Sequence, residues 1–131
     1  MPGDGDHGDD PFEGLPRFGG WGVRRPLRFL AHKLDLDPKQ VGELARILDE
    51  LKIERAQAEV DDRRARAEFA DAILGTTFDA DKAGAAGERR VQSAARLRDA
   101  LTRALAAIHA VLSPEQRERF AYLVRTGVLA F

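Results

Sequence analysis

The sequence lacks several residue types that common chemistries need. The 131 residues include no cysteine, which excludes disulfides, cysteine zinc sites, thiol catalysis and iron–sulfur clusters. Asparagine is also absent, and Ser93 and Ser113 are the only serines. With three histidines beside them, these residues are a poor set for nucleophilic catalysis. We therefore expect no enzymatic activity.

A strong net charge and a long apolar run are missing as well. Lys and Arg number 21 against 22 Asp and Glu, a balance that creates no global field to attract nucleic acid. No apolar run approaches the roughly 20 residues that span a bilayer, and no signal peptide follows Met1. Either the chain is cytoplasmic, or an export signal or membrane anchor was removed from it. We expect no nucleic-acid partner.

Residues 1–23 differ in composition from the rest of the chain. They hold seven of the 12 Gly and three of the six Pro, which predicts a flexible tail before a helical domain over residues 24–131. Residues 1–14 carry five acids and no Lys or Arg, whereas residues 15–33 carry five bases and no acid. Such a tail is either solvated, or it folds back on a basic surface or collects metal ions.

The spacing of apolar residues predicts an all-α fold. A helical stripe begins at Pro26 and continues through Leu34. Long helices are expected over Pro38–Leu74 and Ala80–Leu112, with a turn at residues 75–79 between them. A short helix from Pro114 ends at Gly127. The predicted architecture is a long antiparallel helical hairpin with short flanking helices.

The expected seam between the long helices is thin and partly polar. Arg55 and Asp62 interrupt the stripe of the first long helix, and Arg90 lies in that of the second. The other expected seam positions are Val41, Leu44, Leu48, Leu51, Ala58, Ala65, Phe69, Ala72, Ala83, Ala86, Ala94, Leu97, Leu101, Ala104, Ile108 and Val111. One hairpin cannot cover both sides of such a seam, so we expect a homodimer.

Two predicted helices begin with segments of the same form, Leu36-Asp37-Pro38-Lys39-Gln40 and Leu112-Ser113-Pro114-Glu115-Gln116. Asp37 and Ser113 are expected N-caps, each followed by Pro at the first helical position. Gln116 completes a capping box with Ser113. Each segment resembles the L-T-x-x-Q motif of the Spy/CpxP family, with Asp37 and Ser113 in place of Thr. Residues 120–124 after the second motif are also similar to that family. So is the spacing of the two motifs, which begin 76 positions apart.

The resemblance covers about residues 24–127 and implies a bent all-α hairpin that pairs into a concave homodimer. It also implies a periplasmic location and a role in envelope stress. Members of the family act as ATP-independent chaperones, as modulators of a sensor kinase, or as heavy-metal sensors and zinc-binding proteins. The partner is accordingly an unfolded or membrane-associated protein. A helical scaffold without a ligand is a third possible function.

Two sets of side chains are candidate sites. The expected client-binding residues are Arg55, Arg63, Arg66, Phe69, Arg90 and Leu97. Acids are interleaved with these arginines, so the alternative is a solvated face with i,i+4 ion pairs.

The expected metal ligands are His7, His32 and His109, without an H-x-x-x-H pair. They allow weak zinc or nickel binding at most, and otherwise no cofactor is expected; the alternative is that His32 and His109 are structural residues near helix C-termini.

Overall fold

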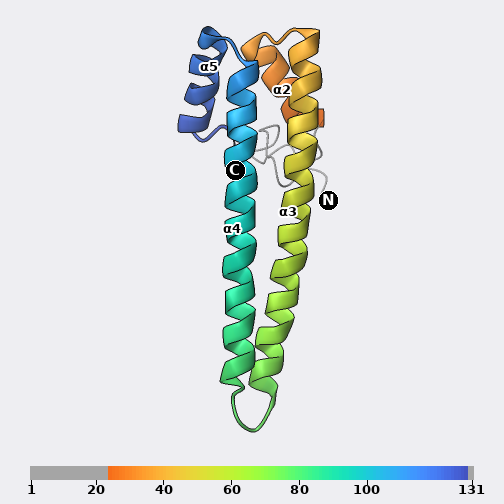
Figure 1. The fold of residues 1–131 in the computed structure, drawn as a ribbon, viewed down its shortest axis with the longest axis vertical. Helices are drawn as coiled ribbons and strands as arrows, with labels where there is room; N and C mark the ends of the chain where they lie inside the picture. Colours follow the sequence, from red (N-terminus) through yellow and green to blue (C-terminus); the bar gives the residue numbers. More distant parts are fainter. Residues whose placement is uncertain (1–23, 130–131) are drawn as a thin grey trace, which may run out of the picture.

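The structure is a computed structural model that describes residues 24–129. Four α-helices and no strand make up this part of the chain (Figure 1): α2 (Arg24–Leu34), α3 (Pro38–Leu74), α4 (Ala80–Val111) and α5 (Pro114–Arg125). The predicted all-α class is confirmed. The tail predicted over residues 1–23 lies outside the described residues. The structure contains one chain, so the homodimer stays a prediction.

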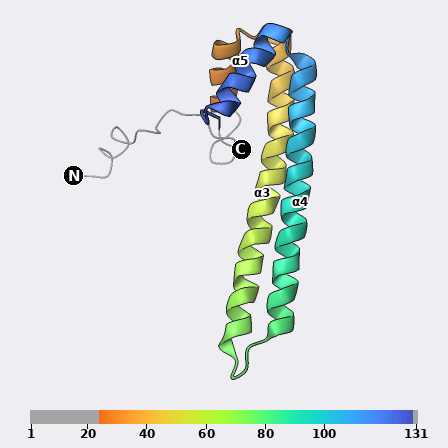
Figure 2. The same cartoon turned by 90° about the vertical axis from the view of Figure 1, so that its left-hand side faces the viewer.

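The two long helices form an antiparallel hairpin. α3 has 37 residues, which at 1.5 Å per residue makes it about 55 Å long, and α4 returns beside it along its length (Figures 1 and 2). α2 and α5 lie together on one side of the hairpin, at the end away from the turn (Figure 2). We call this end, residues 24–51 and 100–129, the base, and residues 52–99 the arm.

The hydrophobic core lies in the base. Leu30 and Leu34 of α2 are fully buried, as is Leu44 of α3. The same cluster contains Ile47, Leu48, Leu51, Ala100, Ala104, Ile108, Leu112, Phe120, Leu123 and Leu129. All four helices contribute to it, so the short flanking helices are held by apolar packing rather than by their own propensity.

The seam of the arm keeps the predicted Ala65, Ala72 and Ala86 but differs from the prediction at its polar positions. Its buried residues are Asp61, Ala65, Ala72, Ala86 and Ser93. Asp61, and not Asp62, is the polar interruption of α3, while Arg90 and Ala94 are exposed and Ser93 takes the seam position on α4. Hydrogen bonds across the seam satisfy the buried carboxylate, and this removes most of the cost of burying it.

Helix boundaries follow the local signals to within two residues. α2 begins at Arg24 rather than Pro26, and α4 ends at Val111 because Leu112 is already extended, with φ −88° and ψ 148°. Asp35 lies just after α2 with φ 57°, the left-handed conformation that often ends a helix. Among the described helices, none is both long and apolar enough to cross a membrane.

Candidate functional site

The two L-T-x-x-Q-like motifs meet in the base. The side-chain amide of Gln40 donates to Gln116 Oε1 at 2.8 Å, and Gln116 Nε2 lies 3.2 Å from Gln40 Oε1. Each glutamine is also the N3 residue of a complete capping box, with Asp37 in the first motif and Ser113 in the second. Residues 76 positions apart are thus joined as a pair.

Each glutamine also donates to a backbone carbonyl at the end of the helix that precedes the other motif. Gln40 Nε2 donates to the carbonyl of Val111, the last residue of α4, at 3.0 Å. Gln116 Nε2 donates to the carbonyl of Leu34 at 3.1 Å and lies 3.3 Å from that of Asp35. These carbonyls have no partner within their own helix. The paired amides therefore connect two helix starts with two helix ends, a structural role.

The leucines of the motifs complete this arrangement. Leu112 is 3 % exposed and belongs to the core, and Leu36 packs against it. The capping roles could be predicted from sequence because they are local, whereas the contact between the two glutamines is not a local signal. Its only trace in the sequence is the repetition of the motif itself.

A groove on the arm brings together five of the six predicted client-binding residues. It encloses about 470 Å³ and lies between α3 and α4. Its lining consists of four arginines, two acids and small or apolar side chains: Arg55, Arg63, Arg66, Arg90, Glu59, Asp62, Ala58, Ala94, Leu97 and Ser93. We call it the arginine groove. Phe69 does not line it and is half-buried nearer the turn.

The arginine groove lies on the face of the hairpin that α2 and α5 cover in the base. Leu44, Leu48, Arg55 and Asp62 follow one stripe of α3, at spacings of 4, 7 and 7. Leu44 and Leu48, in the base, are buried in the cluster that contains Leu30 and Leu34 of α2. Arg55 and Asp62, in the arm, are not covered by α2 or α5 and line the groove.

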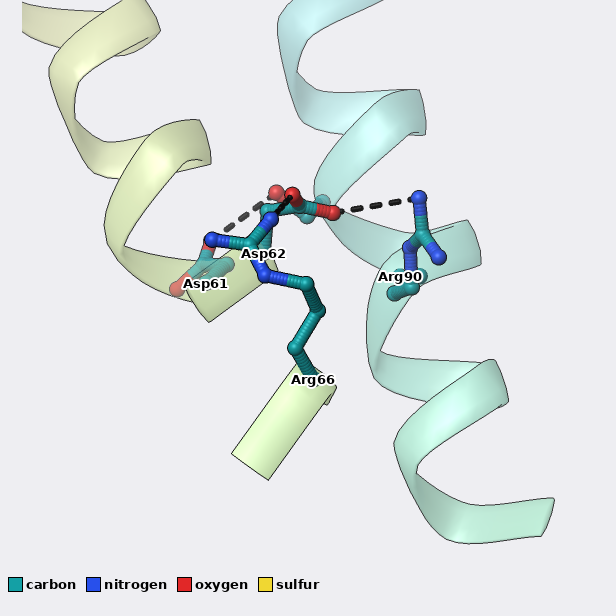
Figure 3. A network of polar contacts seen from close by, with 5 residues as sticks. Asp61, Asp62, Arg66 and Arg90 are labelled. Atoms are coloured by element: carbon teal, nitrogen blue, oxygen red, sulfur yellow. Dashed lines mark hydrogen bonds and ion pairs between the residues drawn. The ribbon is translucent and has the colours of Figure 1, made fainter. Parts of the chain in front are cut away.

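One carboxylate already lies between two of the groove's arginines. Asp62 accepts from Arg66 at 2.5 Å and from Arg90 at 3.1 Å (Figure 3), so the ion pairs join α3 to α4. Neither Arg55 nor Arg63 forms a salt bridge within residues 24–129. Burial lowers the pKa of Arg55, and its Nε has no hydrogen-bond partner there.

A second polar cluster lies in the seam behind the groove. Asp61, 6 % exposed, accepts from Ser93 Oγ at 2.9 Å and from Gln57 Nε2 at 3.0 Å. Arg96 adds an ion pair at 3.1 Å. The hydrogen bonds from Ser93 and Gln57, followed by the contribution of Arg96, lower the pKa of Asp61 against the opposing effect of burial.

The next ion pair along the arm joins Glu68 to Arg89. Arg89 lowers the pKa of Glu68, and Glu68 raises that of Arg89. Sequence reasoning missed Asp61, Ser93 and Arg96 because none belongs to an apolar stripe.

The candidate metal ligands are dispersed. His32 is exposed near the end of α2, and His109 is exposed in the last turn of α4. No group of three or more His, Asp or Glu side chains within residues 24–129 could hold a metal ion. His7 lies outside the described residues.

The comparisons with known proteins identify a family. A family model described as "LTXXQ motif family protein" matches residues 23–123, which include α2, α3, α4 and both motifs. The comparisons give no significant match among curated proteins or among solved structures. The matched family consists of Spy/CpxP-like helical proteins, generally non-enzymatic and associated with the periplasm. With its two glutamine motifs paired at the base of an all-α hairpin, the chain belongs to the LTXXQ motif family.

Proposed function

We propose that the protein is an ATP-independent, chaperone-like binding protein of the periplasm. It holds exposed segments of unfolded or membrane-associated proteins in the arginine groove. The observation that carries this proposal is the composition of the groove, whose lining combines four arginines with the small and apolar side chains of Ala58, Ala94 and Leu97. Guanidinium groups bind carboxylates and backbone carbonyls, and the apolar part of the lining accepts small apolar side chains.

The mechanism is weak and reversible contact. Arg63 is exposed and Arg55 is half-buried, and both lack a salt bridge within the described chain, so both are available to a client. Ion pairs of Asp62 with Arg66 and Arg90 hold the two walls of the groove together. Exposed charge contacts are worth little individually, which suits a protein that must release its client without ATP.

A client-aggregation assay tests this proposal. Arg63→Glu should weaken the suppression of aggregation, because it reverses an exposed charge in the groove. The matched control is Arg103→Glu, which makes the same change in a different cavity, of about 370 Å³, that shares no lining residue with the groove. Suppression by the parent should also weaken with added salt, since charge contacts are screened over about 8–10 Å. Equal suppression by both variants would discard the groove as the binding site.

The proposal includes a homodimer. Six large apolar side chains of the arm are exposed: Ile53, Val60, Ile73, Leu74, Phe78 and Val91. A second copy is the natural cover for such surface, and a stable pair should bury more than about 1,000 Å² in total. Sedimentation at micromolar concentration should give a dimer, and a single species of 14.5 kDa would contradict this.

Metal sensing is the alternative function, and calorimetry separates the two. We expect zinc and nickel to bind no more tightly than about micromolar, because dispersed ligands lack the preorganisation of a tight site. Aggregation suppression should then be the same with and without chelator. A nanomolar site that is lost in His32→Ala or His109→Ala would instead favour a heavy-metal sensor that regulates a membrane partner.

A further inference from the structure

The sequence contains a segment whose charge complements the arginine groove. Residues 4–13, Asp-Gly-Asp-His-Gly-Asp-Asp-Pro-Phe-Glu, carry five acids and no Lys or Arg, with Phe12 among the acids. In the groove the arginines outnumber the acids four to two. Asp62 already occupies the position between Arg66 and Arg90, which demonstrates that a carboxylate fits between its walls. Arg55 and Arg63 are the two arginines of the groove that form no salt bridge within residues 24–129, although Glu59 lies four positions from each along α3.

The ten residues between the acidic segment and α2 are enough to reach the groove. The described chain starts at Arg24, at the end of α2 that points along the hairpin toward the arm (Figures 1 and 2). α2 has 11 residues and extends about 16 Å back from the motif end, while Glu59 in the groove is about 30 Å from the start of α3. The remaining gap is about 15 Å. Residues 14–23 span up to about 33 Å when extended, which is more than sufficient.

We propose that residues 4–13 occupy the arginine groove of their own chain and compete there with clients. This inference rests on the proposed function, because it names an internal competitor for the same site. The carboxylates pair with Arg55 and Arg63, and Phe12 supplies an apolar side chain for the apolar lining at Leu97. The groove is on the face of the hairpin that α2 covers in the base, whereas the turn with the exposed Phe78 is at the far end of the hairpin.

Attachment to the same chain makes this contact effective even though each ion pair is weak. A short tether gives an effective concentration in the millimolar range, far above the micromolar concentration of a second chain. A tail that binds in trans with a dissociation constant of about 0.1–1 mM would then occupy its own groove for half of the time or more. The apparent affinity of an external ligand should fall about two- to tenfold as a result.

Binding of a labelled peptide to the full chain tests the inference. The probe is a fluorescent peptide of residues 1–14, and binding is followed by anisotropy. The tail-neutral variant carries Asp4→Asn, Asp6→Asn, Asp9→Asn, Asp10→Asn and Glu13→Gln. It should bind the peptide about two- to tenfold more tightly than the parent, because its own tail no longer competes. Adding Arg63→Glu to this variant should abolish the gain, and adding Arg103→Glu should leave it intact.

The two proposals fail in different ways. Equal peptide affinity of the parent and the tail-neutral variant would overturn the internal competitor. The aggregation assay with Arg63→Glu judges the groove as a client site independently of that result. Cross-linking in a mixture of isotopically heavy and light chains tests the intramolecular contact. Tail-to-groove links within one chain support it, whereas links mainly between heavy and light chains would overturn it and assign the tail to a second copy.

Discussion

The base and the arm belong to the same two long helices, yet they are stabilised by different contacts. In the base, leucine, isoleucine and phenylalanine from four helices form one cluster. In the arm, two helices meet through alanines, Ser93 and the buried Asp61. Apolar burial contributes roughly 25 cal/mol per Å², and small side chains bury little of it. Most of the stability is therefore expected in the base.

This division suits a protein that presents a charged surface. The cluster in the base fixes the start of both long helices, and the arm carries the arginine groove on residues that the core does not need. Regions with few buried apolar contacts open more readily than the core. The arm can thus open or bend while the base keeps the hairpin assembled, a property that fits the proposed binding of clients.

The largest effect is expected from truncating the core of the base. Leu44 is fully buried, and Leu44→Ala should lower the free energy of unfolding by about 2–5 kcal/mol through lost burial and a residual cavity. The matched control is Leu74→Ala at the end of the arm, where the side chain is 81 % exposed. It should change stability by less than about 0.5 kcal/mol. Urea unfolding measures both, and similar losses would contradict the division into base and arm.

The paired glutamines should give the next largest effect. Gln40→Ala removes the hydrogen bond to the Val111 carbonyl, Gln116→Ala removes the one to the Leu34 carbonyl, and either change removes the bonds between the two amides, at a cost of about 1–3 kcal/mol for each variant. Because the two side chains bond to each other, the double variant should lose less than the sum of the single losses. Gln92→Ala, at an exposed position of α4, is the control and should be neutral. Strict additivity in the double-mutant cycle would mean that the two motifs do not act as a pair.

More of the structure of the base than of the arm could be predicted from the sequence. Asp37, Ser113 and their prolines mark helix starts by local chemistry, so the hairpin and its flanking helices follow from periodicity and caps alone. The Gln40–Gln116 contact joins residues 76 positions apart, and no local rule places them together. In the arm, the choice between Asp61 and Asp62 depends on the hydrogen bond from Ser93 of the facing helix. Pattern reasoning prefers apolar residues and cannot detect such a partner.

The arginine groove was accessible to sequence reasoning for a different reason. Arg55, Arg63 and Arg66 occur within three turns of one helix, and Arg90 with Leu97 occurs on the next, so helical spacing alone brings them to adjoining faces. The same reasoning placed Phe69 with them, although its half-buried side chain does not line the groove. Small differences in the rotation of α3 about its axis decide such positions, and these depend on packing against α4.

Loss of a helix cap should have a smaller effect, and its location should distinguish base from arm. Asp37→Ala and Ser113→Ala each remove the acceptor of an N3 amide in the base, at a cost of about 1 kcal/mol. Asp79→Ala removes the corresponding acceptor at the start of α4, beside the turn. Hydrogen exchange should then accelerate mainly in the first turns of α4, with the base amides unchanged. Uniform acceleration throughout the chain would indicate that base and arm unfold as one unit.

The smallest effect is expected from pH, and it should appear in the arm. Hydrogen bonds from Ser93 and Gln57, together with Arg96, lower the pKa of Asp61 below its value in the unfolded chain. Ionised Asp61 therefore stabilises the fold above about pH 4, the ordinary range of an aspartate, and this contribution is lost as the pH falls through the folded-state pKa. Glu68, paired with Arg89, acts in the same direction.

Urea unfolding between pH 7 and pH 2.5 measures this effect. The urea midpoint should fall more steeply below pH 4 for the parent than for Asp61→Asn. The control, Asp99→Asn, at an exposed ion pair with Arg98, should keep the parent's slope. Hydrogen exchange at low pH should increase in the arm before the base. An equal acid slope in Asp61→Asn would mean that the buried carboxylate does not contribute to the pH dependence of stability.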